Sequence, residues 1–193
     1  YEGAIDKAVE AYLKALELNP KLDKKVNLGF ANIQNALRKN ANSKFFLQDY
    51  KAAADFYRRA YEVSVIPEAG LAADTTSIYN AGYLAFFAGE YERSIEDLRT
   101  AEALGYYADG AIYNVLYNSY VSAYREDKEK MAEAKEFLQN ALVKFPTNTD
   151  IVACMTDVYL VLGESPEPMI NTLQTAIGQG YNAYTPMQLA VYL

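Results

Sequence analysis

The sequence predicts an all-α fold, a solenoid of about four and a half stacked helix-turn-helix repeats with irregular insertions. Two observations predict it. The segment Ile-Tyr-Asn, followed three residues later by Tyr, begins at Ile78 and begins again thirty-four residues later at Ile112. In four places a small, a large apolar and a small residue follow one another at spacing i, i+4, i+7, which places them on one helix face. These sets are Ala8, Tyr12 and Ala15; Ala53, Tyr57 and Ala60; Ser94, Leu98 and Ala101; and Ala134, Leu138 and Ala141.

Turn signals in the first half of the chain set the ends of the expected helices. Pro and Gly interrupt helices, so the first helix ends before Asn19-Pro20, the third before Pro67 and the fourth at Ala88-Gly89. Residues 21–47 form an unusually long first element of their repeat. Helices are expected, in order, at 3–18, 24–47, 49–65, 73–88 and 90–104.

The second half of the chain is divided in the same way. YREDKEK lengthens one turn, Pro146 ends a helix, and the stretch 163–168 separates the last two. Helices are expected at 109–126, 129–144, 149–162 and 167–178. Thr185-Pro186 is typical of an N-cap followed by Pro, so a further helix is expected there. The chain is expected to start with a second helix without its first-helix partner and to stop as a helix begins, as if both ends were cut.

These landmarks resemble the tetratricopeptide repeat, a helix-turn-helix unit of 34 residues. Besides the four sets, the resemblance rests on Gly82, GEY at 89–91, QDY at 48–50, ALELNP at 15–20 and ALVKFP at 141–146. It covers nearly the whole chain and implies a right-handed superhelix. The expected parts are a half repeat at 1–20, repeats at 21–66, 73–108 and 109–146, a degenerate repeat at 147–180, and the start of a further helix at 185–193.

One departure from the repeat pattern has a structural implication. Leu116 stands where Gly82 permits close helix contact in the preceding repeat. A larger side chain at a helix crossing keeps the two backbones apart. We therefore expect the helix pair within 109–146 to be more widely separated than the pair within 73–108.

The residue types of the chain argue against an enzyme. Histidine is absent and Cys154 is the single cysteine, which excludes internal disulfides, Cys/His metal sites and triads with a His base. The pairs Glu96-Asp97 and Glu133-Glu136 alternate with basic residues, as on a solvated helix face, and Cys154 is expected to be a buried, inert thiol. We expect no catalytic residue, no metal site and no cofactor.

Charge is distributed unevenly along the 193 residues, whose net charge is −7. Residues 1–66 hold 11 basic and 8 acidic side chains, and residues 67–193 hold 7 and 17. Phosphate binding needs a basic stripe, so nucleic acid is not an expected partner. Apolar runs are too short to span a bilayer. The sequence does not predict the cellular compartment, because it starts at Tyr1 without Met.

The resemblance also implies where a partner would bind. In the family, first helices of successive repeats line a concave groove, and we expect a protein or peptide partner to dock there. Asn side chains can hydrogen-bond a peptide backbone, and Tyr offers a rigid aromatic surface with a polar tip. The expected groove residues are Asn80, Tyr83, Phe87, Asn114, Tyr117 and Val121.

A carboxylate clamp, which some members of the family use, is not expected. Arg38, Asn42 and Asn80 could supply part of it, but no Lys or Arg lies between Gly110 and Tyr124. The two-sided cationic grip on a partner's C-terminal carboxylate is therefore missing.

Two alternative functions stay open. The helix at 3–18 is expected to expose Val9, Leu13 and Leu16 unless another element covers them, and open ends of a stacking array favour a homo-oligomer. Alternatively, the array positions a larger enzyme or a secretion component.

Overall fold

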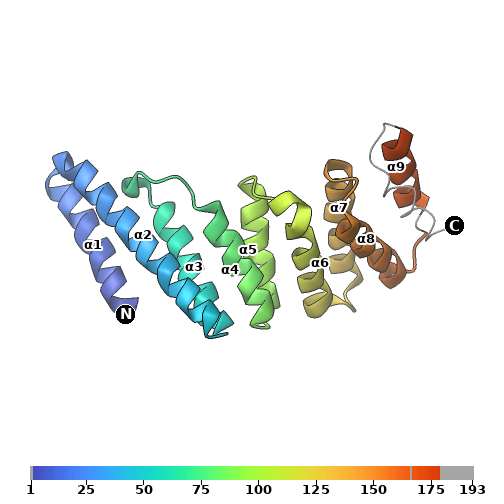
Figure 1. Ribbon diagram of the computed structural model, residues 1–193, viewed down its shortest axis with the longest axis horizontal. Helices are drawn as coiled ribbons and strands as arrows, with labels where there is room; N and C mark the ends of the chain where they lie inside the picture. Colours follow the sequence, from blue (N-terminus) through green and yellow to red (C-terminus); the bar gives the residue numbers. More distant parts are fainter. Residues whose placement is uncertain (1, 166, 179–193) are drawn as a thin grey trace. The chain divides into compact units, whose positions relative to one another are not determined.

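The computed structural model describes residues 2–165 and 167–178. Within these residues the chain contains helices and turns but no strand, which confirms the all-α helical-repeat class. The helix expected at Pro186 lies outside the described residues. The α-helices are α1 (Glu2–Leu18), α2 (Asp23–Phe46), α3 (Tyr50–Ser64), α4 (Thr75–Phe87), α5 (Tyr91–Ala103), α6 (Ala111–Tyr124), α7 (Lys128–Lys144), α8 (Thr149–Leu162) and α9 (Glu167–Gly178), and they follow one another along the chain (Figure 1).

The expected helices are confirmed, and their ends differ by at most two residues, as in 109–126 against Ala111–Tyr124. Short polar side chains start many of them by accepting hydrogen bonds from free amides of the first turn. Asp49 accepts from the amide of Ala52 at 3.2 Å, and Asn148 accepts from the amides of Asp150 and Ile151 at 3.0 and 3.1 Å. These N-caps explain why the helices begin where they do.

The chain divides into two compact units, residues 1–106 and residues 107–193, which we describe separately as unit 1 and unit 2. Unit 1 contains α1 to α5, in which α2 with α3 and α4 with α5 form hairpins. Unit 2 contains α6 to α9. The division of the chain into repeats stays a prediction.

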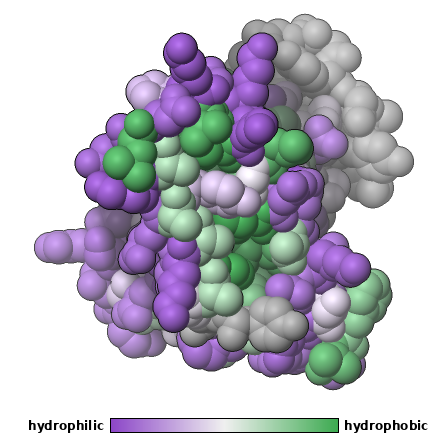
Figure 2. All heavy atoms as spheres, turned by 90° about the vertical axis from the view of Figure 1, so that its left-hand side faces the viewer, coloured by the Kyte–Doolittle hydropathy of each residue, from purple (hydrophilic) through white to green (hydrophobic). Residues whose placement is uncertain are grey.

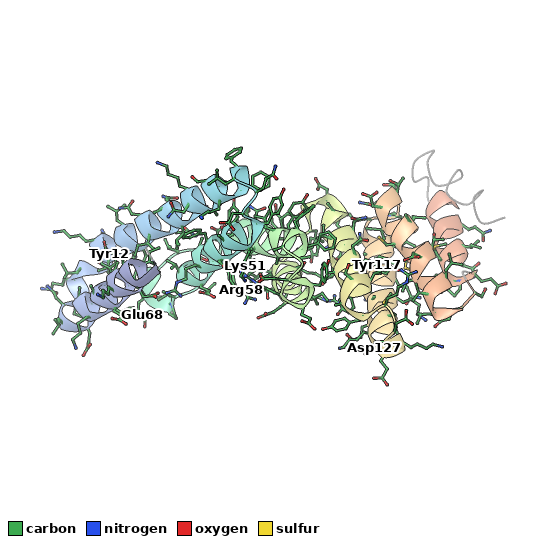
Figure 3. All side chains as sticks on the ribbon, turned by 90° about the horizontal axis from the view of Figure 1, so that it is seen from below. Tyr12, Lys51, Arg58, Glu68, Tyr117 and Asp127 are labelled. Atoms are coloured by element: carbon green, nitrogen blue, oxygen red, sulfur yellow. The ribbon has the colours of Figure 1, made fainter. Side chains whose placement is uncertain are left out.

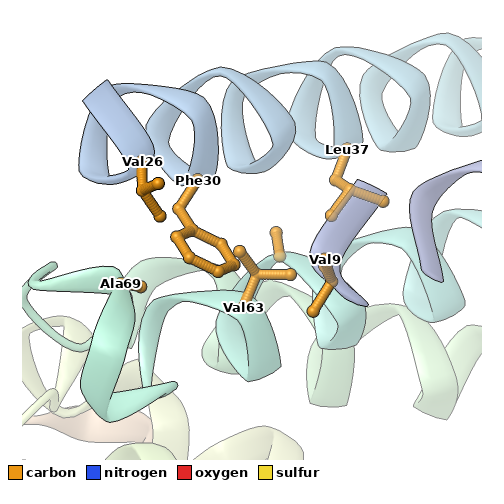
Figure 4. Close-up of a cluster of buried hydrophobic side chains, with 7 residues drawn as sticks. Val9, Val26, Phe30, Leu37, Val63 and Ala69 are labelled. Atoms are coloured by element: carbon orange, nitrogen blue, oxygen red, sulfur yellow. The ribbon is translucent and has the colours of Figure 1, made fainter. Parts of the chain in front are cut away.

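The core of unit 1 joins its first three α-helices (Figure 4). Phe30 and Leu37 project from α2 toward Val63 of α3, and Val9 of α1 completes the cluster. Val9 is 8% exposed, so α2 and α3 are the elements that cover it. Leu13 and Leu16 pack partly buried against the same cluster, whose apolar burial stabilises the docking of α1.

The four small-large-small sets lie where the sequence places them. The sets on α3, α5 and α7 are buried throughout, and the set on α1 is half-buried. Small residues at these positions let neighbouring helices approach, and the large residue fills the space between them. The repeated pattern is therefore the packing seam of the molecule.

The separation expected from Gly82 and Leu116 is confirmed. At Gly82 an added Cβ would stand 2.8 Å from Cγ of Leu98, so α4 and α5 can approach closely only without a side chain there. Leu116 is fully buried in unit 2, and the backbones of α6 and α7 approach less closely than those of α4 and α5. Gly82 thus permits the close approach of α4 and α5, and a leucine stands at the equivalent position of the more open pair.

The outer face of α1 carries a band of apolar residues with hydrophilic residues on both sides (Figure 2). Tyr12 and Ala15 belong instead to the inner side of the helix, where they pack partly buried against the core and the ring of Tyr12 lies 5.6 Å from that of Phe30, whereas Leu18 at the end of the helix is 75% exposed. No helix among the described residues is both long enough and apolar enough to cross a membrane.

Candidate functional site

Helix α4 presents two different faces, as its sequence predicts. Ile78, Ala81, Gly82 and Ala85 are buried against the rest of unit 1. Tyr79, Asn80 and Tyr83 are half-buried, and Phe87 is 51% exposed. No charged residue lies between Asp74, which caps the helix, and Glu90. The exposed stripe of α4 is therefore both uncharged and largely aromatic.

Aromatic rings from α2 and α3 extend this stripe. Ring centroids are 5.0 Å apart between Tyr83 and Phe87, 5.7 Å between Phe87 and Tyr50, 6.2 Å between Tyr50 and Phe45, and 5.9 Å between Phe45 and Phe46. Offset or tilted rings at this spacing attract one another. We call these five residues the aromatic surface of unit 1.

Much of the aromatic surface is open to solvent. Phe46 is 80% exposed, and Leu47, the next residue, is 75% exposed. Contiguous exposed apolar residues are uncommon on a monomer and often mark an interaction site. The sequence analysis identified Tyr83 and Phe87 but missed Phe45, Phe46 and Tyr50. The run Phe45-Phe46-Leu47 at the end of a helix was the available signal.

Asn80 follows Tyr79 on α4 and is half-buried. Tyr79 contacts Tyr83 and Tyr106 at centroid distances of 6.1 and 5.0 Å, and burial raises the pKa of Tyr79. Among the described residues, no group is hydrogen-bonded to the Asn80 carboxamide. That amide keeps its two donors and its acceptor for another molecule.

Two of the three residues considered for a carboxylate clamp, Arg38 and Asn42, are engaged within unit 1. Arg38 donates from Nη1 to Oδ2 of Asp74 at 3.3 Å and from Nη2 to Asn35. Asn42 accepts a hydrogen bond from the hydroxyl of Tyr57 at 2.6 Å. These contacts position α2 against α3 and α4.

Two of the three predicted residues of unit 2, Asn114 and Tyr117, contact α8. Tyr117 on α6 (Figure 3) is 3% exposed, and its hydroxyl donates to Oδ2 of Asp157 at 2.7 Å. Burial, followed by this carboxylate, raises the pKa of Tyr117. Asn114 donates to Sγ of Cys154 at 3.8 Å, and Val121 is half-buried. The binding role of Asn114, Tyr117 and Val121 stays a prediction.

Cys154 is buried, as expected, and burial raises the pKa of its thiol to about 12. A thiol with so high a pKa is protonated at neutral pH and is a poor nucleophile.

Asp97 contradicts the sequence analysis, which placed it on a solvated face. It is 1% exposed, and its Oδ1 accepts from Nε of Arg58 at 2.8 Å. Its Oδ2 lies 3.7 Å from Nε of Arg93, and neither of these two atoms has a hydrogen-bond partner. Burial raises the pKa of Asp97 to about 6. The neighbouring Glu96 is exposed, as expected.

Comparison with known proteins supports the resemblance. Residues 1–22 match the family model described as tetratricopeptide repeat. This match supports a protein of the tetratricopeptide-repeat family. It covers α1 and the turn after it, where the set Ala8, Tyr12 and Ala15 and the segment ALELNP lie. No curated protein matches the chain.

A tetratricopeptide repeat suggests a protein-protein interaction scaffold, and tetratricopeptide-repeat proteins are generally non-enzymatic. Among the described residues, no group of His, Cys, Asp and Glu side chains is placed to hold a metal ion.

Proposed function

We propose that this protein is a non-enzymatic scaffold that binds a peptide or a partner's helix through the first-helix residues of its repeats. The aromatic surface of unit 1 is the observation that supports it. Phe46 and Phe87, both more than half exposed, lie in one connected series of rings. Covering these rings removes apolar area from water, which favours association by about 25 cal/mol per Å².

In the proposed mechanism, aromatic rings supply most of the binding energy and an amide positions the partner. Phe46, Tyr83 and Phe87 pack against apolar side chains of the partner, and aromatic anchors of this kind dominate binding energy in many interfaces. Asn80 hydrogen-bonds the partner's backbone, which positions it without selecting a side chain. Since α4 is uncharged, the segment that lies on it is expected to be apolar and uncharged too.

Asn114, Tyr117 and Val121 remain part of the proposal as the first-helix contacts of unit 2. Because Asn114 is held by Cys154 of α8, a partner would meet it as a fixed group with little side-chain entropy left to lose, whereas Tyr117 is only 3% exposed.

The test is selection of peptides from a displayed library with the full chain, followed by measurement of Kd for the best binder. We expect Phe46→Ala with Phe87→Ala to weaken binding by about 30-fold or more, since truncation of an anchor typically costs over 1 kcal/mol. Asn80→Ala with Asn114→Ala should weaken it by about tenfold. Val143→Ala, on an exposed apolar residue of α7, is the matched control and should leave Kd unchanged. Unchanged binding in the Phe pair would overturn the proposal.

Self-assembly is the second candidate, and the apolar band on the outer face of α1 is the observation that favours it (Figure 2). A second copy could cover that band. Light scattering separates the two candidates, because self-assembly requires the mean mass to rise with protein concentration. A constant monomer mass would remove this candidate and leave the peptide-binding scaffold standing.

A further inference from the structure

A cavity of about 480 Å³ opens on unit 1 among α1, α2, α3 and α5. Its apolar part is formed by Ile5, Leu37 and Phe56. Its charged part is formed by Asp6, Asp55, Arg58, Arg59, Glu62 and Arg93. None of these residues belongs to the aromatic surface. The volume is that of a small-molecule site, which combines an apolar lining with a few placed polar groups.

Two guanidinium groups of the cavity keep unused donors. Arg58, which projects from α3 (Figure 3), donates from Nε and Nη2 to carboxylates of α5, and no described acceptor takes its Nη1. Arg93 donates from Nη1 to Asp55 of α3 and to Glu90, the residue before α5. Its Nη2 has no described acceptor, and its buried Nε has no hydrogen-bond partner. Each guanidinium carries five N–H donors, so both can still bind an anionic group.

Three carboxylates of the cavity keep unused acceptors. Asp6 and Glu62 each give one oxygen to Arg59, and Asp55 gives one oxygen to Arg93. The second oxygen of each carboxylate has no hydrogen bond among the described residues. All three side chains are about half exposed, so these oxygens can be reached by a ligand.

The balance of charge limits which ligand fits. The lining itself holds three arginines and three carboxylates. Behind Arg58 and Arg93 stand three more carboxylates, Asp97, Glu96 and Glu90, and the last of these also pairs with Lys51. The surroundings are thus acidic overall, which disfavours an anion alone. A cation alone would leave the guanidinium donors without an acceptor.

We infer that this cavity binds a small zwitterion with an apolar body, such as an aliphatic amino acid or a dipeptide. Its carboxylate is bound by Arg58 and Arg93, and its ammonium by Glu62 and Asp6. Arg58, which binds the carboxylate, and Glu62, which binds the ammonium, are four residues apart on α3. Their backbone positions are therefore roughly 6 Å apart along the helix axis. The apolar body lies on Ile5, Leu37 and Phe56.

The test is titration of the full chain with L-leucine, leucinamide, N-acetylleucine and leucyl-leucine, followed by NMR of the arginine Nε–H signals. We expect L-leucine or leucyl-leucine to shift the signals of Arg58 and Arg93 saturably. Whichever of the two binds more tightly shows whether the cavity takes a free amino acid or a dipeptide. Leucinamide lacks the carboxylate and N-acetylleucine lacks the ammonium, so each should bind at least about tenfold more weakly than the zwitterions. Equal binding by either of them, or no saturable shift with either zwitterion, overturns the inference.

Variants give an independent readout. Arg93→Lys and Glu62→Gln should each weaken binding of the tighter zwitterion about tenfold, because one removes guanidinium donors and the other the charge that meets the ammonium. Arg38→Lys, in the same unit but outside the cavity, is the matched control. Circular dichroism checks the fold, and Glu62 is exposed enough for its variant to fold if Arg93→Lys does not. Wild-type affinity in Glu62→Gln contradicts the inference. Phe46→Ala should leave this binding unchanged, which separates it from peptide binding.

Discussion

Gly82 shows how much one missing side chain can determine. An added Cβ would stand 3.0 Å from Cβ of Asp97 and from the backbone nitrogen of Leu98, besides the 2.8 Å contact with Cγ of Leu98. Backbone cannot move aside as a flexible side chain can, so a methyl group there must push α5 away from α4. The burial of Asp97 beside this glycine follows from the same close approach.

We therefore expect Gly82→Ala to lower the free energy of unfolding by about 1–3 kcal/mol, measured by urea denaturation with circular dichroism. Gly3→Ala is the matched control, because no atom lies within 4 Å of a Cβ built on Gly3 and alanine is the better helix former. A stability in Gly82→Ala equal to that of the wild type would show that α4 and α5 do not need this contact.

Asp97 predicts a pH dependence at the same scale. Its pKa is raised from 3.8 to about 6 because desolvation outweighs the two arginines, so the folded state binds the proton more tightly than the unfolded state. The resulting stability is fully present below pH 3.8 and is lost as pH rises through about 6. We expect the unfolding free energy of the wild type to fall by roughly 2–3 kcal/mol over this pH range because of Asp97. The variant Asp97→Asn should not show this fall.

The measurement is urea denaturation at a series of pH values between these limits. Glu96→Gln, on the exposed neighbour, should keep the wild-type slope. If Asp97→Asn and the wild type lose stability in parallel, another group carries the pH dependence.

At the scale of the element, sequence signals located the helices well because those signals are local. Proline, glycine and the spacing of apolar residues act within a few positions of where they stand, so α8 and α9 were predicted with their observed bounds. The candidate site was harder. Phe45 and Tyr50 meet Phe87 only after α2, α3 and α4 have packed together, and Asp97 is buried by helices that are distant in sequence. Such contacts have no local signal.

The turn between α2 and α3 contains a strained residue. Gln48 has φ 58°, a left-handed conformation that costs a residue with a Cβ about 1 kcal/mol or more. Gln48→Gly should therefore raise the free energy of unfolding by about 1 kcal/mol in urea denaturation. Ala132→Gly, on an exposed face inside α7, should lower it by a similar amount. A loss of stability in Gln48→Gly would mean that the glutamine side chain stabilises the turn.

At the scale of the whole molecule, repetition explains why the resemblance to tetratricopeptide repeats could be seen in the sequence. Each set of small and large residues is a weak signal, but four sets in one register specify stacked hairpins, and the tetratricopeptide match at residues 1–22 agrees with the first of them. Compact unit 1 buries the sets on α3 and α5, and compact unit 2 buries the set on α7. Repetition did not predict how equivalent residues differ in burial. Tyr83 and Tyr117 occupy equivalent positions, but Tyr83 is half-buried in the aromatic surface, whereas Tyr117 is buried and hydrogen-bonded to Asp157.

The uncharged stretch from Thr75 to Gly89 has a consequence for the conditions under which the protein works. Dissolved ions screen attractions between opposite charges, but α4 contains no charged residue whose attraction could be screened. Contacts made on this helix would therefore not weaken as the salt concentration rises.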